Sequence, residues 1–95
     1  MTAPIETVRL RITGQVQGVG YRLWATRTGT SLGLRGWVRN RTDGSVEALV
    51  TGAPEAVAAM IEATRKGPLG AQVSDVIVIP DQDDRSVGFV ARPTE

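Results

Sequence analysis

Cysteine and histidine are both absent from this chain of 95 residues. Without them the chain has no thiolate nucleophile, no disulfide, no Ser-His-Asp relay and none of the usual zinc or iron ligand sets. Long apolar runs are missing as well, because no segment approaches the ~18 apolar residues of a membrane span. Any chemistry must therefore use other side chains, and we expect neither a cofactor nor a membrane partner.

Aromatic residues make up only 4% of the chain, and the formal net charge is +1. RNA recognition on an open sheet requires several stacking aromatics, and non-specific nucleic-acid binding requires a broad basic surface. Nucleic acid is therefore not an expected partner. Arginine supplies ten of the eleven basic residues, however, so local binding of an anion stays open.

The composition is that of an ordinary globular protein, with 41% hydrophobic and 22% charged residues. This length suits one domain over residues 1–95, and we expect a monomer. The N-terminal MTAPIETVRL lacks the basic start and apolar run of a secretory signal. We therefore expect a cytoplasmic location.

Hydrophobic periodicity predicts alternating strands and helices along the chain. Strands are expected over residues 8–13, 34–41, 45–51 and 71–79, helices over 21–32 and 54–66, and a short fifth strand near 87–91. The βαββαβ order matches a split βαβ sandwich of the α+β class. This architecture is an antiparallel sheet with two helices on one face.

The segment GQVQGVGYR joins the first strand to the first helix. Gly18 and Gly20 permit positive φ angles, and consecutive amides in such a loop form a concavity for an anion at the positive end of a helix. The expected cradle consists of Gln17, Gly18, Val19, Gly20 and Tyr21. Arg22 follows directly, with a planar fork suited to phosphate oxygens. The alternative is a tight connection with an arginine on its rim.

Asn40, in GWVRN, is the expected partner of this loop. On a strand next to the first, its carboxamide would reach the open side of the loop and hold a water as both donor and acceptor. The alternative is a residue at the end of a strand that bonds the backbone of the Asp43–Gly44 turn.

Three further groups of residues are assigned no chemical role. The tryptophans Trp24 and Trp37 are expected to pack against other residues. On one strand face, solvent is expected to surround three arginines, Arg35, Arg39 and Arg41. In a polar loop, solvent is expected to surround three aspartates, Asp81, Asp83 and Asp84.

Between residues 14 and 52 the motifs GQVQGVGYR, LGLRGWVRN and DGSVEALVTG resemble the acylphosphatase family in order and spacing. The resemblance implies a small metal-free hydrolase of acyl phosphates with a ferredoxin-like fold. It assigns phosphate binding to Arg22 and residues 17–21, and orientation of the attacking water to Asn40. The family usually has phenylalanine at the position of Tyr21 and alanine at that of Thr30.

The expected chemistry suits a chain without histidine. An acyl phosphate releases a carboxylate whose conjugate acid has a pKa of roughly 4, so its departure needs no proton donor near neutral pH. An alkyl phosphate would need a general acid or a metal. The expected ligands are an acyl phosphate and inorganic phosphate or another anion. An RNA-binding domain and a non-catalytic module that binds acyl or carbamoyl phosphate are the competing functions.

Overall fold

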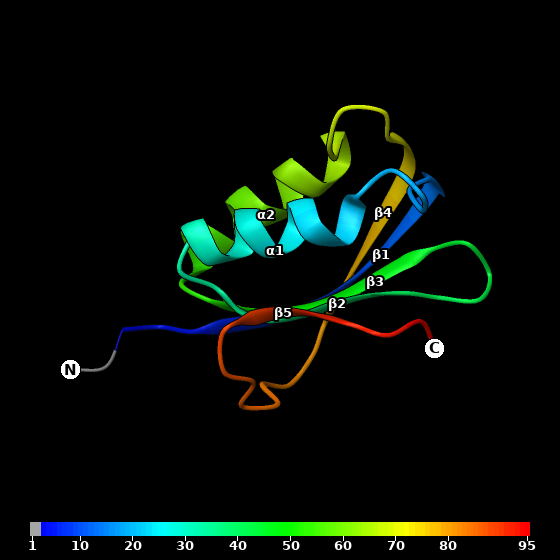
Figure 1. The fold of residues 1–95 in the computed structure, drawn as a ribbon. Helices are drawn as coiled ribbons and strands as arrows, with labels where there is room; N and C mark the ends of the chain where they lie inside the picture. Colours follow the sequence, from blue (N-terminus) through cyan, green and yellow to red (C-terminus); the bar gives the residue numbers. More distant parts are fainter. Residues whose placement is uncertain (1–2) are drawn as a thin grey trace.

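Two helices cover one face of a five-stranded sheet in the computed structural model, which describes residues 3–95 (Figure 1). The elements in chain order are β1 (Glu6–Gln15), α1 (Tyr21–Ser31), β2 (Arg35–Asn40), β3 (Val46–Gly52), α2 (Pro54–Lys66), β4 (Gln72–Pro80) and β5 (Phe89–Arg92). The predicted split βαβ sandwich is confirmed, and the optional fifth strand is present.

The strands lie in the order β4-β1-β3-β2-β5, and four of them form an antiparallel sheet. The fifth strand departs from the prediction, because β5 pairs with β2 in parallel. The chain leaves β4 at one edge and reverses direction before it reaches the other edge. Since β2 already runs opposite to β4, the returning strand lies parallel to β2, and the sheet is mixed.

The core lies between the sheet and the helices. Val8, Leu10 and Ile12 of β1 are buried on the face that the helices cover, as their two-residue spacing predicts. The helices add further buried residues, which are Tyr21, Ala25 and Gly29 of α1 and Val57, Met60 and Thr64 of α2. Of the neighbouring residues Thr28 and Gly29, Gly29 is the buried one.

Gly29 lies where α1 packs against Phe89 of β5. A Cβ built on Gly29 would lie 2.7 Å from Cγ of Phe89, which is too close for an aliphatic carbon. The helix ends at Ser31, Gly33 just beyond it has a φ of 74°, and the Leu34 N–H donates to the Gly29 carbonyl at 2.9 Å. A glycine that is unfavourable for helix propensity thus lets the aromatic ring pack against the helix axis.

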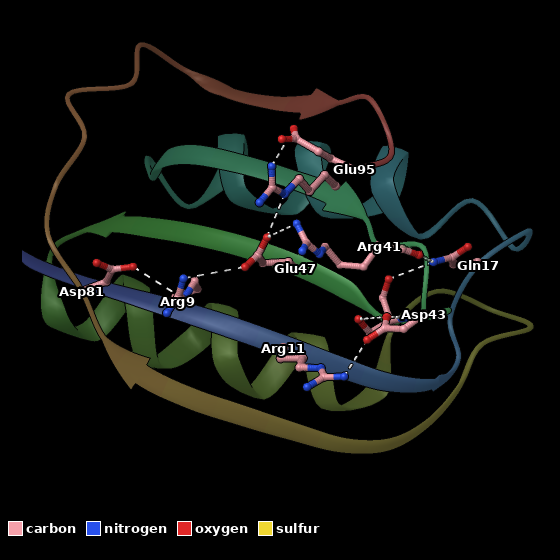
Figure 2. A network of polar contacts seen from close by, with 10 residues as sticks. Arg9, Arg11, Gln17, Arg41, Asp43, Glu47, Asp81 and Glu95 are labelled. Atoms are coloured by element: carbon pink, nitrogen blue, oxygen red, sulfur yellow. Dashed lines mark hydrogen bonds and ion pairs between the residues drawn. The ribbon is translucent and has the colours of Figure 1, made fainter.

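The face of the sheet opposite the helices carries a network of ion pairs (Figure 2). The Glu47 carboxylate accepts a hydrogen bond from Nε of Arg39 at 2.8 Å and lies 3.6 Å from Nη1 of Arg41. Arg9 approaches the same carboxylate at 3.9 Å. The Arg39 side chain is only 18% exposed, so the prediction of a solvated arginine is wrong at this position.

The acidic loop between β4 and β5 is not simply solvated, which corrects a second prediction. Asp83 forms a 2.6 Å ion pair with Arg35, and Asp84 accepts a 3.1 Å hydrogen bond from Nε1 of Trp37. Because Arg35 and Trp37 belong to β2, these contacts hold the loop against that strand.

Both tryptophans pack, as predicted. Trp37 is 8% exposed, and the guanidinium carbons of Arg39 and Arg92 each lie 4.9 Å from its ring centroid. Trp24 meets the Tyr21 ring edge to face, with centroids 5.2 Å apart.

Candidate active site

Three glycines, one near the end of β1 and two in the loop that follows it, are required for two different reasons. A Cβ on Gly14 would lie 2.2 Å from the Gln72 carbonyl oxygen, so this glycine allows β1 to pass close to β4. A Cβ on Gly18 or Gly20 would meet no atom of residues 3–95 within 4 Å, but the φ angles of these glycines are 76° and 78°. The glycines inside the loop therefore serve backbone conformation, as the sequence predicted.

The main-chain N–H groups of residues 17–22 have no hydrogen-bond acceptor among the residues that the structure describes. The first bond of α1 runs from the Trp24 N–H to the Gly20 carbonyl at 3.0 Å. The N-cap residue Gly20 has no side chain with which to cap the helix, and the first turn holds no acidic residue. Since polar main-chain groups normally find partners, this run of free donors at a helix start is suited to an anion.

These donors border a hollow of about 450 Å³. The lining residues are Val16, Gln17, Gly18, Gly20, Tyr21, Arg22, Leu23, Thr26, Asn40 and Ala91. Arg22 is the one charged side chain among them. Its Nη1 donates to the Arg92 carbonyl on β5 at 3.1 Å, and within residues 3–95 it forms no ion pair.

Asn40 lies at the end of β2, paired in register with Val46, and lines the same hollow. Its carboxamide makes no hydrogen bond to any residue in the described part of the chain, whereas its main-chain carbonyl accepts the Glu95 N–H at 3.1 Å. The turn that follows is bonded instead by Asp43, which accepts from the N–H and hydroxyl of Ser45 at 2.9 and 2.6 Å. The Asn40 amide is thus left available to the hollow.

All the residues predicted for the site line the hollow, except Val19. The side chain of Val19 packs against the core, so this residue offers the loop only its main chain. Four lining residues were not predicted from the sequence, namely Val16, Leu23, Thr26 and Ala91. Helical spacing from Arg22 was a signal for Thr26, but no local pattern places Ala91 there, because its position depends on the parallel pairing of β5 with β2.

Residues 3–95 contain neither a candidate metal site nor a candidate membrane-spanning helix. No group of three or more His, Cys, Asp or Glu side chains in this range is placed to hold a metal ion. None of the helices in the same range has the length and apolar content needed to cross a membrane.

The fold and the loop define a small α+β domain whose first strand-to-helix connection presents free amides and one arginine to a shared hollow. The chain belongs to the acylphosphatase family, whose model matches residues 8–91. This match confirms the resemblance seen in the sequence motifs at the level of the family. The enzymes of this family hydrolyse acyl phosphates.

Relatives of similar length support this assignment. An acylphosphatase from Rhizobium etli is 58% identical over 71 residues, which are 75% of this chain and 76% of the relative. One from Rhodospirillum rubrum is 49% identical over 90 residues, covering 95% of this chain and 99% of the relative. The crystal structure of an acylphosphatase from Bacillus subtilis superposes with a TM-score of 0.88 at 31% identity, over 94% of this chain and 99% of that one.

Proposed function

We propose that the hollow between the β1–α1 loop and β2 is the site at which this chain hydrolyses an acyl phosphate to a carboxylate and inorganic phosphate. The observation that carries the proposal is the run of N–H groups over residues 17–22 that have no acceptor within residues 3–95. Beside them lies the guanidinium of Arg22, which forms no ion pair in the same range. Together they supply main-chain donors, a helix N-terminus and one full positive charge to a phosphoryl group.

Phosphoryl transfer depends mainly on positioning and on stabilising the charge of the equatorial oxygens. The loop amides and the Arg22 fork bind those oxygens. The Arg92 carbonyl, which accepts from Nη1 of Arg22, leaves the other guanidinium N–H groups for phosphate. The departing carboxylate needs no proton, so the absence of histidine from the chain is no obstacle.

Asn40 is assigned the role of orienting the attacking water. Its carboxamide has no protein partner among residues 3–95, so both its donor and its acceptor are free to hold a water in line with the departing carboxylate. An amide is too weak a base to take the proton of that water, and the phosphate accepts it. The reaction then needs neither a metal nor a protein base.

Kinetics of three variants test the assignment. Arg22→Ala should lower kcat/KM for acetyl phosphate by about 100- to 1,000-fold and raise the inhibition constant of inorganic phosphate, because a charged oxyanion donor is lost. Arg22→Lys should recover little of the lost kcat/KM, because an ammonium group lacks the planar fork of the guanidinium. Asn40→Ala should lower kcat by about 100-fold with little change in phosphate inhibition.

Arg27→Ala is the matched control, because Arg27 is exposed on the same helix and does not line the hollow. It should keep the wild-type kinetics. A wild-type rate for purified Asn40→Ala would refute the role of that residue.

Substrate selectivity separates the proposal from its competitors. Phosphate release from acetyl phosphate, unaffected by chelator and much faster than from p-nitrophenyl phosphate, is expected of the enzyme. Inactivity on both with retained phosphate binding would favour a non-catalytic module. A monomeric state and a cytoplasmic location complete the proposal, and sedimentation and cell fractionation test them.

A further inference from the structure

Gln17 makes two side-chain hydrogen bonds that its predicted role in the loop does not use. Its Nε2 donates to the Arg41 carbonyl and to the Ser45 carbonyl, each at 2.8 Å. Figure 2 shows its amide nitrogen turned toward the hairpin that carries Arg41 and Asp43. Both partners are carbonyl oxygens and the NH₂ group has two protons, so the orientation of the amide is unambiguous.

The two acceptor carbonyls belong to the pair of residues that closes the β2–β3 turn. The Arg41 N–H donates to the Ser45 carbonyl at 2.8 Å, and the Gly44 N–H donates to the Arg41 carbonyl at 3.2 Å. Arg41 directly follows Asn40 in the chain. The Gln17 amide is therefore attached to the hairpin one residue away from the carboxamide assigned to the water.

Gln17 also directly precedes Gly18, the first glycine of the anion loop with a positive φ. Within residues 3–95, its two bonds are the only hydrogen bonds that join residues 16–20 to residues 40–46. The Asn40 carboxamide has no protein partner of its own in the same range, so its location relative to the loop depends on how the hairpin is held.

We propose that the Gln17 side chain is a positioning residue that fixes the Asn40 carboxamide relative to the anion loop and thereby sets the line of attack of the water. The inference rests on the proposed function of the hollow and adds to it a link between the two halves of the site. Gln17 contributes its N–H to phosphate binding through the main chain, while its side chain serves the attacking water through the hairpin.

This division of labour predicts a specific kinetic signature. Gln17→Met keeps the length of the side chain and the main-chain N–H, and removes the two bonds to the hairpin. Because misplacement of a reacting group by about 1 Å can cost about 100-fold in rate, kcat should fall by about 10- to 100-fold. KM and the inhibition constant of inorganic phosphate should change by less than about threefold, because the loop amides and Arg22 remain.

A double-mutant cycle with Asn40→Ala gives the decisive measurement. If Gln17 acts through Asn40, then Gln17→Met should change the residual kcat of Asn40→Ala by less than about twofold. Gln15→Met is the matched control, because Gln15 is exposed and its side chain makes no hydrogen bond within residues 3–95. This control should keep the wild-type kcat. Gln17→Asn, which keeps an amide but is one methylene shorter, replaces Gln17→Met if that variant does not fold.

The inference is overturned by an equal fall in kcat in both backgrounds, by a full kcat in Gln17→Met, or by a loss confined to phosphate affinity. Each of these results leaves the proposed function intact as long as Asn40→Ala alone is impaired. A wild-type rate in Asn40→Ala would refute the proposed water site itself, and the positioning role with it, so the two failures are distinguishable.

Discussion

Tyr21→Phe tests how the chain secures the end of α2. The Tyr21 hydroxyl donates to the Thr64 carbonyl at 2.7 Å, and Tyr21 is 2% exposed. In a continuing helix this carbonyl would accept the N–H of the residue four positions later, but that residue is Pro68, which has none. The phenol therefore replaces a main-chain donor at the C-terminus of the helix.

The variant removes one oxygen, keeps the ring and leaves a buried carbonyl without a partner. A buried orphan acceptor costs about 1–3 kcal/mol, so we expect the free energy of unfolding to fall by about 2 kcal/mol. For a domain of this size that is a decrease in Tm of roughly 8–16 °C. The kcat for acetyl phosphate at 25 °C should not change, because the main-chain N–H at position 21 is retained. Urea unfolding with a loss under about 0.3 kcal/mol would refute the reasoning.

The Tyr21 phenol should also make the free energy of unfolding depend on pH. Burial raises the pKa of the Tyr21 phenol above its usual value near 10. Above pH 10 the unfolded chain releases this proton while the native state keeps it, so native stability falls as pH rises, by at most about 1.4 kcal/mol per pH unit. Tyr21 is the only tyrosine. The stability advantage of wild type over Tyr21→Phe should therefore shrink above pH 10, and parallel stability curves would contradict the assignment.

Two further predictions concern packing and the acidic loop. Gly29→Ala should lower the free energy of unfolding by about 1–3 kcal/mol, because its Cβ would lie 2.7 Å from Cγ of Phe89. Thr30→Ala, at the exposed neighbouring position, should raise the free energy of unfolding by about 0.5 kcal/mol. If urea unfolding showed that both variants are stabilised, the close approach of Gly29 to Phe89 would be contradicted. The hydrogen bond from Arg35 lowers the pKa of Asp83 from 3.8 to about 2, so its stabilising contribution is present above pH 4 and is lost as pH falls toward 2. Asp83→Asn should flatten this acid limb in thermal melts, and an unchanged limb would show that the pair does not stabilise the fold.

The local sequence alone determined most of the secondary structure and the outline of the candidate site. Alternation in β1, the proline at the start of α2 and the glycine stop at Gly33 each act over a few residues, so a linear pattern is enough to read them. The positive φ angles of Gly18 and Gly20 are a local property in the same sense. The motifs around Arg22 and Asn40 are likewise short stretches of sequence, so they indicated the family without the structure.

Tertiary structure decided the contacts between residues that are distant in the chain. The bonds of Gln17 to the hairpin, of Tyr21 to Thr64 and of Arg22 to Arg92 span 24 to 70 residues. They depend on which strands are neighbours, and the parallel placement of β5 beside β2 follows from the long return past the sheet. Periodicity shows which face of an element is buried but not which element covers it, so these partners were determined only when the sheet was assembled.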